Sequence, residues 1–278
     1  MTAQSSFIGQ TVIITGASMG IGAATARLFF REVANLVLLA RGEEALTDLA
    51  EELGSPERVL TVPLDVTDVA GCRAMLETVR QRFGRIDVLV NNAGYHARGA
   101  ALDVDPDALG RMVDVNLKAP IMLTRMVLPD LKKQGSGAVI NVASLAGRTP
   151  VPGSAVYSAT KFGLRAFTLA LAEELAGSGI KVASVSPGPI ATGFIMSEID
   201  EVSDLTFSQP ISTAEEVAEQ IVALCRNRVL DQPMPRISGY LTTLSYLFPT
   251  LGRALRPALE RRGRKTKERL KAEARDSK

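Results

Sequence analysis

Three side chains between residues 144 and 161 have types and spacings that suit proton transfer. Ser144 lies thirteen residues before Tyr157, and Lys161 follows Tyr157 by four. Helical residues four apart share a face, so the lysine ammonium can approach the phenol. A free tyrosine has a pKa of about 10, and a nearby cation lowers it by roughly 1 to 3 units. The spacing therefore predicts an acid-base site in which Lys161 activates Tyr157.

The element that must position Ser144 is an apolar run over residues 138–143, which predicts a buried parallel strand. Ligands of open α/β sheets bind outside the carboxyl ends of such strands. Taken singly, Ser144, Tyr157 and Lys161 are equally consistent with a loop serine, a partly buried tyrosine and a solvated lysine. Their combination favours a catalytic site.

A glycine loop with the sequence TGASMGIG occupies residues 15–22, between an apolar run at 12–14 and a helical pattern at 23–29. Gly16, Gly20 and Gly22 allow a tight turn and a close approach of backbone to a pyrophosphate at the helix N-terminus. On its own, such a loop is as well explained by a glycine-rich turn without a ligand.

Together these motifs resemble the short-chain dehydrogenase/reductase family. Its TGxxxGxG, NNAG, YxxxK and PG motifs match residues 15–22, 91–94, 157–161 and 187–188, in the family's order, and the resemblance spans residues 11–192. It implies an α/β fold, namely a Rossmann-type doubly wound parallel sheet. It also implies a catalytic tetrad of Asn116, Ser144, Tyr157 and Lys161, in which Asn116 holds a water that passes protons to Lys161. Ser144 and Tyr157 would bind the substrate.

The same resemblance implies the cofactor-binding residues, with Thr192 reaching the nicotinamide carboxamide. They are Gly16, Ser18, Met19, Gly20, Ile21, Gly22, Arg41, Asp65, Val66, Asn92, Ala93, Gly94, Tyr157, Lys161, Pro187, Gly188, Ile190 and Thr192.

Arg41 follows the apolar run 36–40, at the position where the adenosine ribose is read. An acidic residue there would bind the 2′-hydroxyl of NAD and repel a 2′-phosphate, whereas a guanidinium suits phosphate. We therefore expect NADP(H), with NAD(H) less favoured. The alternative is that Arg41 is a solvated strand end, and Met19 offers no second basic group.

Two cysteines and one histidine, His96, make a zinc mechanism unexpected, and no metal site is predicted. His96 follows the NNAG motif and is expected to be a half-exposed loop residue, with the mouth of the active site as the alternative. The first ten residues lack the basic start and apolar core of a secretion signal, so we expect a cytoplasmic protein. We expect one catalytic domain over residues 1–236 and a C-terminal extension over residues 237–278.

The extension is apolar and then basic. Residues 237–252 carry no charge, whereas residues 253–278 hold eleven Lys or Arg against four Asp or Glu. Apolar residues at helical spacing predict one helical stripe, which Pro249 would interrupt. The stripe consists of Leu241, Leu244, Phe248, Leu251, Leu255 and Leu259.

Sixteen uncharged residues are too few to span a bilayer. An apolar stripe beside a basic run favours instead a peripheral membrane contact through residues 241–271. The alternative is a stripe that packs on the body or on a second subunit, with a disordered basic end. No nucleic-acid partner is expected because no aromatic residues interleave the basic run. We expect a homo-oligomer, although the strand that closes a tetramer in many relatives is not evident.

The resemblance predicts interconversion of a carbonyl and a secondary alcohol by hydride transfer. Apolar residues Phe194, Ile195 and Met196 in a predicted lid, together with the apolar extension, favour a lipophilic substrate such as a lipid, steroid-like or terpenoid ketone. A 3-oxoacyl thioester reductase of fatty-acid type has the same motifs and is the alternative enzyme. A non-catalytic dinucleotide-binding sensor or scaffold is the alternative of another class.

Overall fold

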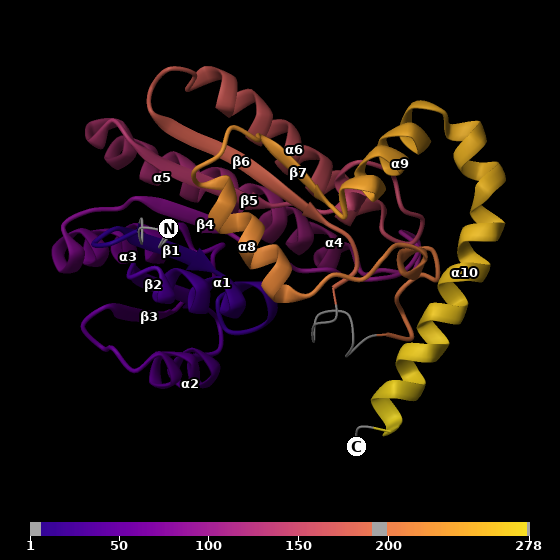
Figure 1. Ribbon diagram of the computed structural model, residues 1–278, viewed down its shortest axis with the longest axis horizontal. Coiled ribbons are helices and arrows are strands. Elements are labelled where there is room, and N and C mark those ends of the chain that lie inside the picture. Colours follow the sequence, from indigo (N-terminus) through magenta and orange to yellow (C-terminus); the bar gives the residue numbers. More distant parts are fainter. Residues whose placement is uncertain (1–6, 191–198, 277–278) are drawn as a thin grey trace, which may run out of the picture.

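The apolar runs of the sequence form one seven-stranded parallel sheet (Figure 1). The computed structural model describes residues 7–190 and 199–276. The strands are β1 (Thr11–Thr15), β2 (Asn35–Ala40), β3 (Val59–Pro63), β4 (Val88–Asn91), β5 (Gly137–Val142), β6 (Ile180–Pro187) and β7 (Asp231–Met234). Their order is β3-β2-β1-β4-β5-β6-β7, and every pairing is parallel. The predicted doubly wound α/β fold is confirmed.

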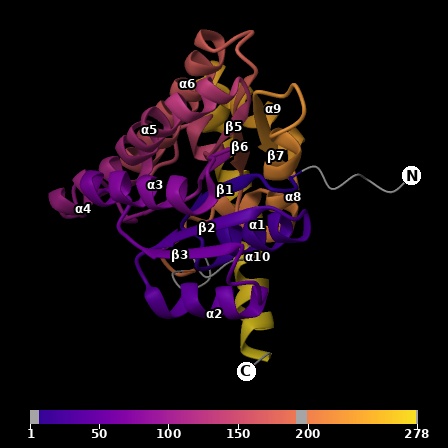
Figure 2. The same ribbon diagram turned by 90° about the vertical axis from the view of Figure 1, so that its left-hand side faces the viewer.

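Helices cover both faces of this sheet, because each central strand is apolar on both sides. The helices are α1 (Gly20–Arg31), α2 (Glu43–Leu53), α3 (Val69–Phe83), α4 (Pro106–Val113), α5 (Ala119–Gln134), α6 (Ala155–Glu174), α8 (Ala214–Leu224), α9 (Arg236–Leu247) and α10 (Pro249–Asp276). One core lies between the sheet and α1, α2 and α8, and the other lies between the sheet and α3, α5 and α6. Figure 2 shows α3, α4 and α5 on one side of the strands and α1 and α8 on the other.

The order of the strands reverses at β1, which pairs with β2 on one side and β4 on the other. Ile13 lies opposite both Val37 and Leu89 in this register. Such a reversal opens a crevice outside the carboxyl ends of the strands, where α/β proteins bind ligands. The fold therefore positions the glycine loop, which follows β1, at this crevice.

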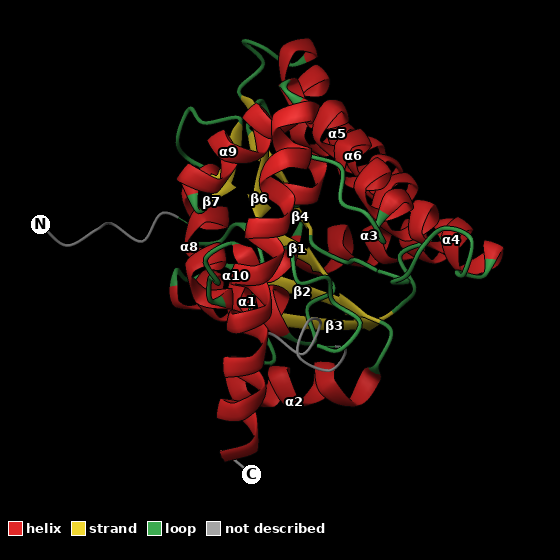
Figure 3. Cartoon of the chain, turned by 90° about the vertical axis from the view of Figure 1, so that its right-hand side faces the viewer, coloured by secondary structure: helices red, strands yellow, loops and turns green. Residues whose placement is uncertain are grey.

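The extension forms two helices that meet at Pro249, as the predicted interruption requires. α10 continues to Asp276, so the basic run is helical in the described residues and not a disordered end. It packs on the 3-10 helix Thr206–Ser208, and a side chain at Gly263 would collide with the Asp204 carbonyl oxygen. Figure 3, viewed from the side of α10, shows this helix in front of the strands.

Candidate active site

A cleft of about 1380 Å³ lies at the carboxyl ends of the strands, and residues of α9 and α10 line its outer side. Nearly all of the predicted cofactor and catalytic residues line it. Gly22 and Asn116 lie behind its wall, and Thr192 lies outside the described residues, as do Phe194, Ile195 and Met196 of the predicted lid. The structure thus brings together residues that are far apart in the sequence.

Ser144, Tyr157 and Lys161 meet in this cleft. The Ser144 hydroxyl lies near enough to the Tyr157 phenol to lower the pKa of that phenol. Ser144 caps the start of the 3-10 helix Leu145–Gly147 after β5, and its Oγ accepts from the Ala146 amide at 3.1 Å. Tyr157 and Lys161 lie one turn apart near the start of α6, with Lys161 Nζ 5.7 Å from the centre of the phenol ring. The hydroxyl pair can therefore bind one substrate oxygen, with an ammonium nearby.

Burial dominates the acid-base properties of the pair. It raises the pKa of Tyr157, and the Ser144 hydroxyl and the Arg98 charge offset part of that increase. It lowers the pKa of Lys161 to about 8. Lys161 Nζ donates to the Val142 carbonyl oxygen at 2.9 Å. The direction at Tyr157 is opposite to the one expected from an activating Lys161, because in this structure desolvation outweighs the Ser144 hydroxyl and the Arg98 charge.

Asn116 lies in a π-helical segment, Asp114–Lys118, between α4 and α5. Its side chain is fully buried and is held by Tyr95: Oδ1 accepts from the Tyr95 amide and Nδ2 donates to the Tyr95 carbonyl oxygen, both at 2.7 Å. Such π-bulges are frequent at functional sites because they redirect a single turn of helix. Asn116 lies close to Gly94, as does the Lys161 ammonium, so the three groups share one corner of the site.

The glycine loop has the geometry of a phosphate cradle. Gly16 and Gly20 have φ angles of 64° and 54°, in the left-handed region that favours glycine. A side chain at Gly22 would collide with the Gly16 carbonyl oxygen. Met19 caps α1 with no side-chain hydrogen bond, so the first amides of that helix remain available to an anion.

Asn92 holds this loop in place and does not merely line the cleft. Its Nδ2 donates to the carbonyl oxygens of Thr15 and Gly16, at 2.9 and 3.0 Å. In return, the Thr15 hydroxyl accepts from the amides of Asn92 and Ala93. Asn92 therefore ties the end of β4 to the glycine loop after β1.

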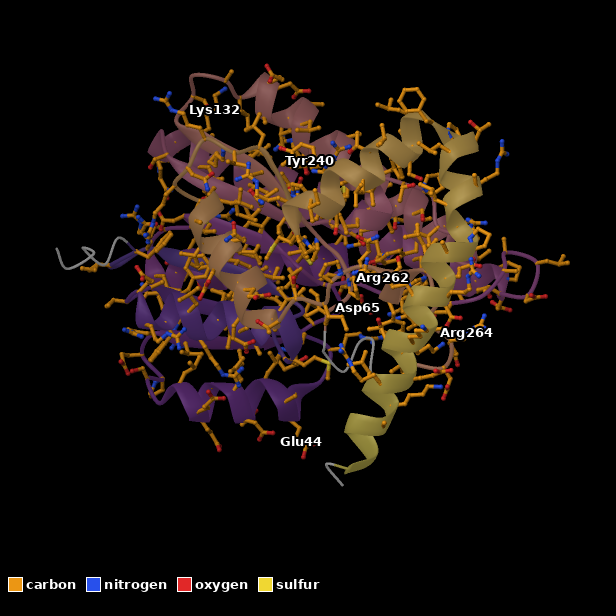
Figure 4. All side chains as sticks on the ribbon, turned by 45° about the vertical axis from the view of Figure 1, so that its right-hand side comes forward. Glu44, Asp65, Lys132, Tyr240, Arg262 and Arg264 are labelled. Atoms are coloured by element: carbon orange, nitrogen blue, oxygen red, sulfur yellow. The ribbon has the colours of Figure 1, made fainter. Side chains whose placement is uncertain are left out.

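Asp65 lies after β3, and its carboxylate accepts hydrogen bonds from Thr67 and Arg111. Burial raises the pKa of this carboxyl, but hydrogen bonds from Thr67 and Arg111 outweigh burial and lower it. The Arg111 guanidinium lies 2.7 Å from the carboxylate, and Arg111 was not among the predicted site residues. It lines the cleft from α4, and no sequence motif marks it. Figure 4 shows where Asp65 lies.

His96 lies in the active site and not merely at its mouth. Its ring stacks on the Tyr157 ring with centres 4.1 Å apart, and its Nδ1 is 2.9 Å from the Arg98 guanidinium. Burial, with the Arg98 and Lys161 charges, lowers the pKa of His96 to about 3. His96 is therefore neutral at physiological pH. Its place two residues after the NNAG motif was the one sequence clue to this position.

Comparison with known proteins identifies the family of this chain. Residues 10–203 match the family model of the short chain dehydrogenases. The chain belongs to the short-chain dehydrogenase/reductase family. The resemblance read from the motifs is confirmed.

Three proteins illustrate what this chain is similar to. Sulfoacetaldehyde reductase 2 of Chromohalobacter salexigens is 41% identical over 217 residues, which cover 76% of this chain and 86% of the relative. Dehydrogenase/reductase SDR family member 7B of Bos taurus is 33% identical over 272 residues, covering 92% and 83%. The crystal structure of 3-ketoacyl-(acyl-carrier-protein) reductase from Brucella melitensis, complexed with NADH, is 30% identical, with a TM-score of 0.75 and coverage of 83% and 99%.

As a short-chain dehydrogenase/reductase, the chain is an oxidoreductase that uses a nicotinamide dinucleotide and acts on alcohol or carbonyl groups. The glycine loop of this chain fits such a cofactor. Gly22 has no side chain to collide with the Gly16 carbonyl oxygen, and no side chain caps the first amides of α1, so these amides can bind a pyrophosphate. Arg41 lies exposed on the rim of the cleft, beyond β2. The Gly188 amide donates to the Met234 carbonyl oxygen, which fixes the PG turn against β7.

Neither metal nor membrane-spanning features occur in the part of the chain that the structure describes. No group of three His, Cys, Asp or Glu side chains there could hold a metal ion. No described helix is both long enough and apolar enough to cross a bilayer.

Proposed function

We propose that this chain is an NADP(H)-dependent oxidoreductase that interconverts a carbonyl and a secondary alcohol on a lipophilic substrate. The observation that carries the proposal is the composition of the cleft. The Ser144 and Tyr157 hydroxyls lie at its inner end, and five leucines of α9 and α10 form its outer wall. These leucines are Leu241, Leu244, Leu251, Leu255 and Leu259. Such a wall favours an apolar substrate over a fully hydrated one.

The chemical roles follow from the positions of these groups. Ser144 donates a hydrogen bond to the carbonyl oxygen, and Tyr157 delivers the proton to that oxygen during reduction. Lys161 supplies positive charge beside Tyr157, and Asn116 with its neighbouring backbone holds the water that returns the proton. When bound, the nicotinamide supplies or accepts the hydride. The residues that would hold it are those of the glycine loop, Arg41, Asp65, the NNAG motif and residues 187–192.

The test is oxidation of NADPH with ketones graded in size and polarity. We expect turnover to rise with lipophilicity and to disappear in Tyr157→Phe, which keeps the ring that stacks on His96. Turnover that is independent of lipophilicity would contradict the proposed substrate class. Tight NADPH binding without turnover on any carbonyl would favour the non-catalytic sensor.

The preference for NADP(H) rests on Arg41, an exposed guanidinium with no acidic partner among the described residues. It is suited to pair with a 2′-phosphate. We expect Arg41→Asp to reverse the ratio of the dissociation constants of NADPH and NADH. Equal constants for the two coenzymes in the unmodified protein would refute this part of the proposal.

A 3-oxoacyl thioester reductase is the second candidate, favoured by the likeness to the ketoacyl reductase of known structure. Reduction of acyl-carrier thioesters in preference to free ketones would select it.

We further propose a catalytic domain over residues 1–236, a homo-oligomer, and a cytoplasmic protein with a peripheral membrane contact through residues 241–271. Light scattering of the purified protein tests the oligomer.

A further inference from the structure

The outer side of α9 is an apolar face without a protein partner in the part of the chain that the structure describes. Its residues recur at intervals of one, three or four and are 44–68% exposed. They are Ile237, Tyr240, Leu241, Leu244, Leu247 and Phe248, which we call the apolar face of α9. A contiguous apolar face of this kind on a folded protein marks an interaction surface.

This face is continuous with the substrate cleft. Leu241 and Leu244 belong to both, and across the mouth of the cleft they are joined by Leu251 and Leu255 of α10, which are also half exposed. An apolar molecule bound at the face would therefore reach the inner end of the cleft without crossing water.

One side of α10 changes from apolar to basic along its length. Leu251, Leu255, Arg262 and Lys265 recur at helical spacing on this side, and both basic side chains are exposed. Figure 4 labels Arg262 and Arg264 on α10 and Tyr240 on α9. No Asp or Glu occurs between Asp231 and Glu260, so no acidic group lies in the segment that carries the apolar face of α9 and the leucines of α10.

The C-terminal half of α10 is anchored to the body, which fixes the direction of its basic side. Lys267 Nζ donates to the carbonyl oxygens of Asp200 and Val202, and Arg264 pairs with Asp204 at 3.1 Å. These contacts use Arg264 and Lys267. Arg262 and Lys265 remain exposed on the side of α10 that carries Leu251 and Leu255.

The apolar face of α9 could bind a second copy of the chain or a membrane surface, and the charge distribution favours an anionic membrane. Residues 253–278 carry +7 and the whole chain +2, so the first 252 residues carry −5. A second copy joined through a two-fold axis at α9 would bring two basic helices together, which is unfavourable. An anionic lipid surface attracts the basic side of α10 and solvates the apolar face.

We propose that the apolar face of α9 and the basic side of α10 bind an anionic membrane surface, and that the cleft takes its lipophilic substrate from the bilayer. This inference rests on the proposed carbonyl-alcohol activity and deepens it. It assigns the substrate to molecules that dissolve in lipid.

The test compares flotation of the full chain with vesicles of phosphatidylcholine alone and with vesicles that also contain phosphatidylglycerol. The variant is Leu247→Glu, because Leu247 is 64% exposed and does not line the cleft. The matched control is Ile8→Glu, since Ile8 is 65% exposed at the amino end of the sheet, away from the cleft. NADPH oxidation is measured on a water-soluble ketone and on a long-chain ketone carried in the vesicles.

We expect binding to the anionic vesicles that weakens with salt and falls roughly tenfold or more in Leu247→Glu, with no change in Ile8→Glu. Turnover of the soluble ketone stays the same in both variants, while the KM for the vesicle-borne ketone rises only in Leu247→Glu. Vesicle binding that Leu247→Glu leaves unchanged would overturn the inference. So would a lipid-free dimer that Leu247→Glu dissociates. Absence of turnover on the soluble ketone in the unmodified protein would instead refute the proposed function, without reference to vesicles.

Discussion

Asp231→Asn should lower the stability of the protein far more than neutralising the carboxylate of an exposed ion pair with the same N–O distance. The Asp231 carboxylate accepts from the guanidinium groups of Arg148 and Arg165, each at 2.6 Å, and from the Ser184 hydroxyl at 3.1 Å. Arg148 is only 8% exposed, and burial lowers its pKa although Asp231 opposes that change. Neutralising Asp231 leaves the Arg148 charge buried beside an amide.

The expected magnitude follows from burial. Removing one partner of a buried ion pair costs about 3–5 kcal/mol, and the asparagine oxygen retains one acceptor, so we expect a loss of about 3 kcal/mol. For a chain of this size that corresponds to a decrease in Tm of roughly 6–12 °C. Arg148 follows the turn that carries Ser144, so turnover should fall as well.

Glu52→Gln is the matched control. Arg27 and Glu52 also lie 2.6 Å apart, but their side chains are 42% and 50% exposed. Such a pair contributes at most about 1 kcal/mol. Urea unfolding and thermal melts of both variants measure the difference. Equal losses in Asp231→Asn and Glu52→Gln would refute the reasoning, because they would show that burial of Arg148 has no energetic consequence.

Two further predictions concern the active site. Gly22→Ala should raise the dissociation constant of NADPH at least tenfold, because the new methyl group collides with the Gly16 carbonyl oxygen. The control is Gly110→Ala in α4, which has open space around it and should leave NADPH binding unchanged while stabilising the fold by about 0.5–1 kcal/mol. Calorimetric titration measures NADPH binding to both variants, and normal binding in Gly22→Ala would contradict the close packing. His96 is the only histidine, and its folded pKa lies below its unfolded value, so the unfolded chain binds the extra proton and stability should fall as the pH falls from about 6.5 towards 3. Between pH 6.5 and 5 the loss should be about 1.6 kcal/mol by urea unfolding and should vanish in His96→Phe. The same pH dependence in that variant would show that His96 is not the group responsible.

The sequence predicted those parts of the fold that depend on local pattern. Apolar runs located the central strands, and α8 begins at a Thr213–Glu216 capping box, which is a local signal of a helix start. β7 was missed because its residues are Asp, Gln, Pro and Met, which do not alternate in polarity, and an edge strand paired only with β6 does not need to be apolar.

Contacts between distant segments could not be predicted from periodicity. The pairs Arg111 with Asp65 and Arg148 with Asp231 join residues 46 and 83 positions apart, and no spacing rule relates them. The same holds for the direction of the stripe in α9, which could face the body or solvent according to its helical spacing alone. The motifs singled out Ser144, Tyr157 and Lys161, which line one cleft, but the stack of His96 on Tyr157 depends on how the loop after β4 folds back over α6.

The measurement that tests the central claim most directly is steady-state NADPH oxidation with a lipophilic ketone, by the unmodified protein and by Tyr157→Phe, alongside NADPH binding to both. The account predicts turnover by the unmodified protein, a decrease of about 10²-fold or more in Tyr157→Phe, and NADPH binding that the variant retains. Turnover that survives in Tyr157→Phe would show that Tyr157 does not deliver the proton, and would contradict the account.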